Sequence, residues 1–134
     1  MQTVFLQKFE AGAEKALALQ EVIDFLNEHG TVTQQGASVS VSLPADYVAA
    51  SIQIIPDGHG GVLCLSLQQP RMDDDFRNFA FEAMVKFGVC LFDEALTHLY
   101  VASPATDDIP AALRRECAAG AVSIYRPRQL FPTP

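Results

Sequence analysis

The chain has 134 residues, of which 49% are hydrophobic and 19% are charged, and its formal net charge at pH 7 is −7. This length is typical of one domain, and the composition is too apolar for a disordered chain. The negative charge argues against a nucleic-acid partner, which would need a basic surface, and no run of about 20 apolar residues suggests a membrane span. We therefore expect a single soluble domain over residues 1–134, with no nucleic-acid or membrane partner.

The first 30 residues contain one clear periodic pattern. Residues 3–9 fit a short strand or an early helical turn equally well, and Lys8 and Glu10 interrupt the apolar core that a signal peptide needs. From 13 to 29, apolar residues recur at three-to-four spacing, which predicts an amphipathic helix. Gly30 stands where a left-handed C-terminal cap would be expected.

After this predicted helix, the pattern of apolar residues repeats every two positions. Residues 38–43 and 48–54 alternate apolar with small or polar side chains, which predicts two strands with one buried face. Residues 62–67 are apolar on one parity and partly on the other, which indicates an interior strand. The outward face of the first two strands is nearly uncharged, which suits close approach by another protein or cover by a helix or loop: Ser38, Ser40, Ser42, Ser51 and Gln53.

The stretch 55–63, IPDGHGGVL, looks most like a ligand-binding motif. A phosphate loop would lead into a helix N-terminus, but here a strand pattern follows. Asp57-Gly58 and Gly60-Gly61 are residues that a hairpin loop needs for positive φ. We therefore predict a hairpin connection, with His59 at an exposed tip where a lone imidazole is a poor metal site.

The strongest pattern covers residues 73–95, where apolar residues follow helical spacing without a break and predict the main core helix. Asp73, Asp74 and Asp75 stand at its start, where an N-cap acceptor and negative charge are favourable. Adjacent carboxylates can also hold a hard cation, but the spacing of an EF-hand is absent. Helix capping is therefore the simpler interpretation.

This predicted helix also has a second apolar row, formed by Phe81, Val85 and Val89. A helix packed on one side needs an apolar face of about 100°, and this face is wider. The helix therefore lies centrally, between the sheet and another helix, or part of it meets a partner.

Shorter elements complete the chain. Residues 97–102 read as a strand, 109–117 as a short helix, 121–125 as a last strand, and 126–134 as an extended tail with three prolines. Strands grouped in this way predict an α+β fold: a single-layer, mostly antiparallel sheet of about five strands, with a long core helix and one or two further helices packed mainly on one face.

The cysteines give little sign of chemistry. Cys64, Cys90 and Cys117 are widely spaced and form no CxxC, so neither a disulfide framework nor a zinc site is indicated, and a reducing cytoplasm fits best. Cys90 could act as a nucleophile only if His98 lay beside it, whereas a buried cysteine is usually a small hydrophobe. No hydrolase, metalloprotease, Walker or dinucleotide-binding motif occurs. We therefore predict no enzyme activity, catalytic residue, metal or cofactor.

Charge is distributed unevenly: residues 1–108 contain five Lys/Arg and fifteen Asp/Glu, whereas 109–134 contain four Arg and one Glu. The chain is acidic, has no catalytic motif, starts with MQTVFLQKFE and contains the acidic segment MDDDF. In these features it resembles small bacterial immunity proteins of interbacterial, type VI-like toxin systems. The resemblance implies a non-enzymatic inhibitor that binds a toxin with a basic surface and blocks its active site. The arginines near the C-terminus depart from a uniformly acidic binder and leave the binding face open.

Our first hypothesis is therefore a cytoplasmic immunity or antitoxin protein, with Asp73, Asp74 and Asp75 supplying charge and Phe81 and Val85 supplying apolar contact. A second hypothesis is a secretion chaperone for an effector protein. A monomer would favour the first and a homodimer the second. A third is a small enzyme or ligand-binding domain with its pocket between the sheet and the main helix.

Overall fold

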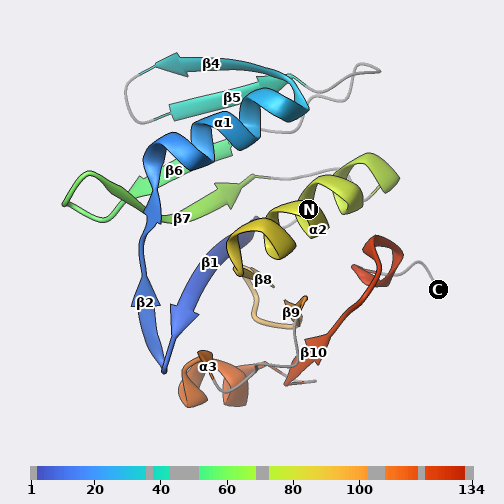
Figure 1. Ribbon diagram of the computed structural model, residues 1–134. Helices are drawn as coiled ribbons and strands as arrows, with labels where there is room; N and C mark the ends of the chain where they lie inside the picture. The colour runs from blue at the N-terminus through green and yellow to red at the C-terminus, as the bar shows by residue number, and fades with distance from the viewer. Residues whose placement is uncertain are drawn as a thin grey trace.

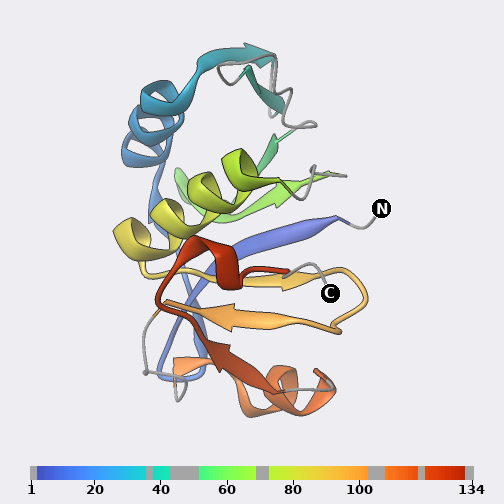
Figure 2. The ribbon, with the colours of Figure 1, turned by 90° about the vertical axis from the view of Figure 1, so that its right-hand side faces the viewer.

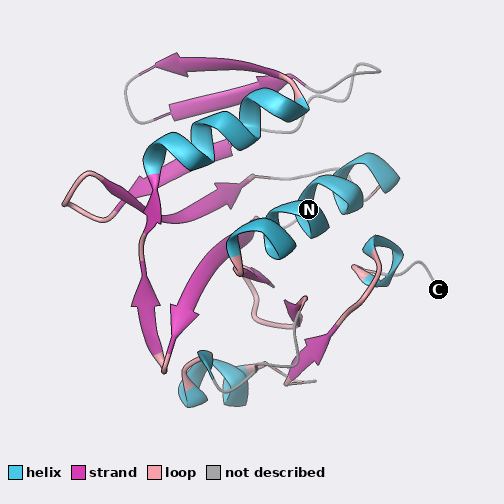
Figure 3. Ribbon diagram, viewed as in Figure 1, coloured by secondary structure: helices cyan, strands magenta, loops and turns pink. Residues whose placement is uncertain are grey.

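The computed structural model describes residues 3–35, 38–42, 52–68, 73–102, 108–117 and 120–131. Figures 1 and 3 show the arrangement of its elements. In chain order these are β1 (Val4–Glu10), β2 (Ala13–Lys15), β3 (Leu17–Ala18), α1 (Leu19–His29), β4 (Thr31–Gln35), β5 (Ser38–Ser42), β6 (Ile52–Pro56), β7 (Gly61–Leu67), α2 (Asp74–Phe87), β8 (Cys90–Asp93), β9 (Leu99–Val101), α3 (Ala111–Glu116), β10 (Ala121–Ser123) and the 3-10 turn η2 (Pro127–Gln129).

The fold is α+β, as predicted, and is built on one curled, mostly antiparallel sheet. Eight described strands follow the order β10-β9-β8-β1-β7-β6-β5-β4, while β2 pairs with β1 and β3 pairs with β7. Among these strands only β9 and β10 run parallel. The sheet is thus larger than the predicted sheet of about five strands, because it includes segments that the sequence pattern assigned to helices or to no strand.

The first such segment precedes α1. The helix predicted over 13–29 begins only at Leu19, since residues 13–15 pair with β1 and residues 17–18 pair with β7. The cause is a tight turn at Ala11 and Gly12, whose φ values of 52° and 82° send the chain back along β1. The helix ends at His29 as predicted, but Gly30 has φ of 179°, which is extended and not the predicted left-handed cap.

The predicted helix over 73–95 is also too long. It ends at Phe87 because Gly88 adopts the left-handed conformation with φ of 69°, and its N–H donates to the Met84 carbonyl. The following β8 strand has apolar residues on both faces of the sheet, so helical spacing matches it by coincidence. Thr31–Gln35, which the sequence pattern assigned to no strand, forms the edge strand β4.

Two hydrophobic clusters pack on opposite faces of the sheet. The larger places α1 and α2 against inward side chains such as Leu6, Leu65 and Leu91, and Figure 2 shows the sheet bending around α2. The smaller lies on the other face, near α3, and contains Cys90, Leu99, Val101, Ile109 and Cys117. Helix α2 is therefore central, which accounts for most of its wide apolar face.

The prediction of an extended tail is wrong for its described part, residues 126–131. Residues 127–129 form η2, and Leu130 is fully buried. Arg77 of α2 fixes this segment, since its guanidinium donates to the carbonyls of Leu130 (2.8 Å) and Phe131 (3.0 Å). Figures 1 and 2 show η2 beside α2.

Part of the predicted uncharged sheet face cannot be compared with the structure. Residues 43–51 lie outside the described residues, so the predicted strand over 48–54 is seen only from Ile52, as β6. Gln53 is exposed on β6, as the alternation predicts.

Candidate functional site on helix α2

The start of α2 shows that the three predicted aspartates have different roles. The Asp73 carboxylate accepts the backbone N–H of Phe76 at 3.0 Å and is the N-cap of the helix. Asp74 is exposed and forms an ion pair with Arg77 (3.6 Å). Asp75 is exposed. The capping interpretation is thus confirmed for Asp73, and Asp74 and Asp75 are the two that face solvent.

The two predicted apolar contact residues, Phe81 and Val85, also differ in their exposure to solvent. Phe81 is half-buried and packs against the main core, and Val89, after the helix, is buried. Val85 is 62% exposed, which is unusual for a valine on a central helix. Val85 is therefore the residue of the second apolar row that is exposed enough to contact a partner.

Asp75 and Val85 lie on the same solvent-facing stripe of α2. The exposed residues Asp75, Asn78, Glu82 and Val85 follow spacings of three and four, so their side chains project from one face of the helix. The stripe extends along the helix for about 15 Å. It is acidic at its N-terminal end, and at its C-terminal end the exposed Val85 lies beside the exposed Lys86.

Helix α1 lies on the same side of the sheet as α2, as Figures 1 and 2 show, and adds further negative charge there. Its exposed carboxylates are Glu21, Asp24 and Glu28. The two helices are joined by His29 of α1, whose Nε2 lies 2.8 Å from the Glu82 carboxylate. The exposed surface of this helix pair is therefore predominantly acidic.

A cleft opens beside Val85, where β1 and β9 end and β8 begins. Its volume is about 570 Å³, and its walls include Met84, Val85, Gly88, Val89 and Cys90. Lys8, Phe9 and Glu10 of β1 line another side, and Val101, Ala102, Asp108 and Ile109 complete it. The cleft thus lies between the sheet and the main helix, where the ligand-binding hypothesis places a pocket.

Cys90 and His98 occupy different environments. Cys90 is buried on β8, and burial raises the pKa of its thiol to about 12. It belongs to the smaller hydrophobic cluster, with Leu99, Val101, Ile109 and Cys117. The His98 ring instead contacts Tyr100 and Phe131. At neutral pH Cys90 is therefore a neutral, buried thiol, as the hydrophobic interpretation predicts.

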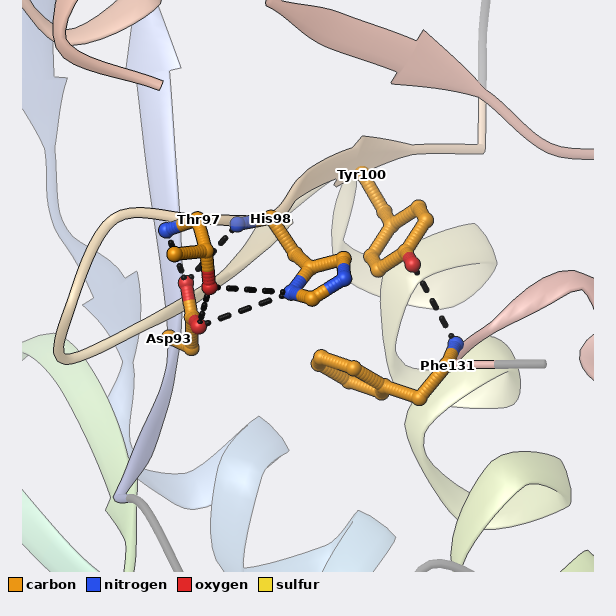
Figure 4. Close-up of polar contacts among 5 residues, drawn as sticks. All are labelled: Asp93, Thr97, His98, Tyr100 and Phe131. Carbon is orange, nitrogen blue, oxygen red and sulfur yellow. Dashed lines mark hydrogen bonds and ion pairs between the residues drawn. The ribbon is translucent and has the colours of Figure 1, made fainter. Parts of the chain in front are cut away.

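His98 belongs to a polar cluster in the β8–β9 loop, which Figure 4 shows. Asp93 is 2% exposed and accepts the N–H groups of Thr97 (2.8 Å) and His98 (2.9 Å), as well as the Thr97 hydroxyl. Because that hydroxyl donates its hydrogen bond to Asp93, its oxygen can accept one from Nδ1 of His98 (3.1 Å) in the tautomer that carries a proton there. The Asp93 carboxylate thus provides acceptors for two backbone N–H groups of the loop, which indicates a structural role for the cluster.

The same region fixes the C-terminal segment. The Tyr100 hydroxyl accepts the N–H of Phe131 (3.2 Å), and the two rings meet edge to face with centroids 5.2 Å apart (Figure 4). Burial raises the pKa of the Tyr100 phenol. The cluster therefore connects the β8–β9 loop to the end of the described chain.

The IPDGHGGVL stretch is a hairpin connection between β6 and β7, as predicted. Gly58 and Gly60 have φ of 87° and 86°, and His59 is exposed at the tip. The Asp57 carboxylate accepts the N–H groups of His59 (2.7 Å) and Gly61 (2.9 Å), so it is engaged in the turn.

Among the residues that the structure describes, no group of three or more His, Cys, Asp or Glu side chains is placed to hold a metal ion. No helix in this part of the chain is long and apolar enough to cross a membrane. Comparison with protein-family models, with curated proteins and with solved structures finds no match.

The sequence singled out Asp74, Asp75 and Val85, which are exposed in the structure, but it did not indicate most of the residues that line the cleft. Lys8 and Glu10 of β1 are brought near Asp108 by hydrogen bonds from the turn at Ala11 and Gly12 to Asp108, 97 positions away in sequence for Ala11, which periodicity cannot reveal. The signal that was available is Gly88, because a glycine in a helical pattern can mark its end.

Proposed function

We propose that the protein is a non-enzymatic, protein-binding module of the immunity or antitoxin type, which binds a toxin with a basic surface and blocks its activity. The observation that carries this proposal is the stripe on α2, where exposed carboxylates and the exposed Val85 share one face. The proposed setting is the cytoplasm, where the three free, buried thiols would remain reduced.

The two ends of the stripe would contribute differently. Carboxylates on α1 and α2 would speed the approach of a basic surface, because complementary charge raises the association rate. Val85, beside the cleft, would supply the desolvated apolar contact that slows dissociation. An acidic surface with one apolar anchor therefore fits a partner that presents an apolar side chain surrounded by Lys or Arg.

The stripe is also rigidly held, which favours affinity because little order is lost on binding. Asp73 caps the start of α2, Gly88 ends it, and the contact from His29 to Glu82 fixes its middle against α1. We therefore expect the surface to bind without rearrangement.

The test is capture of a partner by the immobilised chain from a lysate of its native organism, with two matched pairs of variants. Asp75→Lys on the stripe is paired with Glu94→Lys in the β8–β9 loop, and Val85→Lys is paired with Val122→Lys on β10. All four positions are exposed. Each stripe variant should weaken binding by about tenfold or more, and each paired control should not.

The captured protein is then expressed with and without the chain. It should arrest growth when expressed alone, and the wild-type chain should relieve the arrest while Val85→Lys does not. Recovery of no partner, a partner without toxicity, or equal binding by stripe and control variants would refute the proposal. Light scattering on the free chain should show a monomer, whereas a homodimer would favour the chaperone hypothesis.

A further inference from the structure

The cleft beside α2 has the size and composition of a small-molecule site. Its volume of about 570 Å³ falls within the range of about 300–1,000 Å³ that is typical of ligand pockets, which combine apolar walls with a few polar groups. Its walls are mainly apolar, with Phe9, Met84, Val85, Val89, Val101 and Ile109 from four different segments. An apolar ligand body would be desolvated there.

Lys8 is the cation of this cleft, and it is half-buried. Its ammonium lies against the end of α2, since a Cβ built on Gly88 would be 3.7 Å from Lys8 Nζ. The last carbonyls of a helix favour a positive charge at this place. Within the part of the chain that the structure describes, no ion pair is formed by Lys8, whereas Lys15 lies 4.0 Å from Glu10.

The acidic groups of the cleft lie at its other end. Glu10 is exposed and is the partner of Lys15. The Asp108 carboxylate accepts the N–H of Ala11 (3.2 Å) in the β1–β2 turn. The cleft is therefore polarised, with carboxylates at the turn and an ammonium at the helix end. An anionic group would be repelled from the first end and attracted to the second, where the full charge of the Lys8 ammonium exceeds the partial negative charge of about one half at the helix end.

We propose that this cleft binds a small carboxylate with an apolar body, whose anionic group pairs with the Lys8 ammonium and whose body lies along the apolar walls. A half-buried cation without a counterion loses hydration, and a bound anion would compensate for that loss. This binding goes beyond the proposed toxin inhibition and does not require a protein partner. Cys90 lines the cleft as a neutral thiol, so the proposal includes no covalent step.

The experiment uses decanoate as the probe and decanol as its uncharged counterpart, followed by calorimetry and by ¹H–¹⁵N NMR. Decanoate should bind saturably, shift the amide signals of Gly88, Ala102 and Ile109, and bind at least tenfold more tightly than decanol. Lys8→Met keeps the aliphatic stem and should weaken decanoate binding by about tenfold or more, as for loss of a charged hydrogen bond. Lys8→Arg should retain binding to within a few-fold.

The matched control is Lys86→Met, which removes an exposed lysine from the last turn of the same helix. It should leave decanoate binding unchanged. The proposal is overturned if decanoate does not bind saturably, if decanol binds equally well, or if Lys8→Met lowers the melting temperature but not the affinity. The last result would assign Lys8 to stabilisation of the helix end alone. None of these outcomes depends on Asp75 or on a captured partner, so this site and the toxin-binding stripe can fail separately.

Discussion

Two hairpin loops of the sheet are each organised by one aspartate, but the two carboxylates differ in burial. Asp57, between β6 and β7, accepts the N–H groups of two loop residues beside solvent. Asp93, at the start of the β8–β9 loop, accepts two N–H groups and a hydroxyl while it is 2% exposed. The same hydrogen-bond pattern is therefore found once with a partly exposed carboxylate and once with a buried one.

The two environments act differently on the carboxylate. Hydrogen bonds from the N–H groups of His59 and Gly61 lower the pKa of Asp57. For Asp93, burial alone raises the pKa, but hydrogen bonds from Thr97 and His98 outweigh it and the pKa is lowered. Water can reach the Asp57 carboxylate but is largely excluded from the Asp93 carboxylate, so we expect burial of the carboxylate to decide how much each aspartate contributes to stability.

The largest effect is expected for Asp93→Ala. The change removes a buried carboxylate and leaves the N–H groups of Thr97 and His98 without their acceptor, which should lower the free energy of unfolding by about 2–4 kcal/mol. Urea denaturation measures the change. Asp93→Asn retains an acceptor and should fall between Asp93→Ala and wild type, and equal losses for both would show that charge alone matters.

The second prediction concerns pH. Because the folded-state pKa of Asp93 lies below its unfolded value of about 3.9, its stabilisation is fully present above that value and is lost as pH falls through the folded pKa. Asp57 contributes with the same sign. Between about pH 5 and pH 2 the free energy of unfolding of Asp93→Asn should therefore fall less steeply than that of wild type. A parallel decline in the two proteins would contradict the assigned shift.

The two loops also show what the sequence could predict. The β6–β7 hairpin was predicted from its glycines and Asp57, because its geometry is local and needs particular residues at particular positions. The β8–β9 loop was missed, since Leu91 and Phe92 fit helical spacing as well as strand alternation. Leu96, with φ of 56°, gives no residue-type signal for the turn. A tight turn can therefore be predicted from the sequence where glycine residues indicate positive φ angles.

In the candidate site on α2, too, local features could be predicted from the sequence and tertiary features could not. Asp73 as N-cap and the exposed Asp75 could be predicted, because capping and helical periodicity depend on neighbours in sequence. The exposure of Val85 and the half-burial of Phe81 could not be separated, since both lie on one apolar row. What distinguishes them is how α1 and the sheet pack around α2, and this depends on tertiary contacts.

An intermediate effect is expected for Gly58→Ala in the exposed hairpin. Gly58 has φ of +87°, and a Cβ there would meet nothing within 4 Å. The cost is therefore backbone strain without a steric clash, about 1 kcal/mol in the free energy of unfolding. Urea denaturation measures it, and no loss would mean that the loop relaxes to another turn.

The smallest effect is expected for Asp57→Ala. Its removal frees the N–H groups of His59 and Gly61, but these lie at an exposed turn where water can accept them. The melting temperature should fall less than in Gly58→Ala and much less than in Asp93→Ala, as calorimetry at neutral pH can measure. If Asp57→Ala matched Asp93→Ala, the hydrogen-bond pattern itself, and not burial, would set the stability of both loops. The matched pair therefore separates local turn chemistry from desolvation within one sheet.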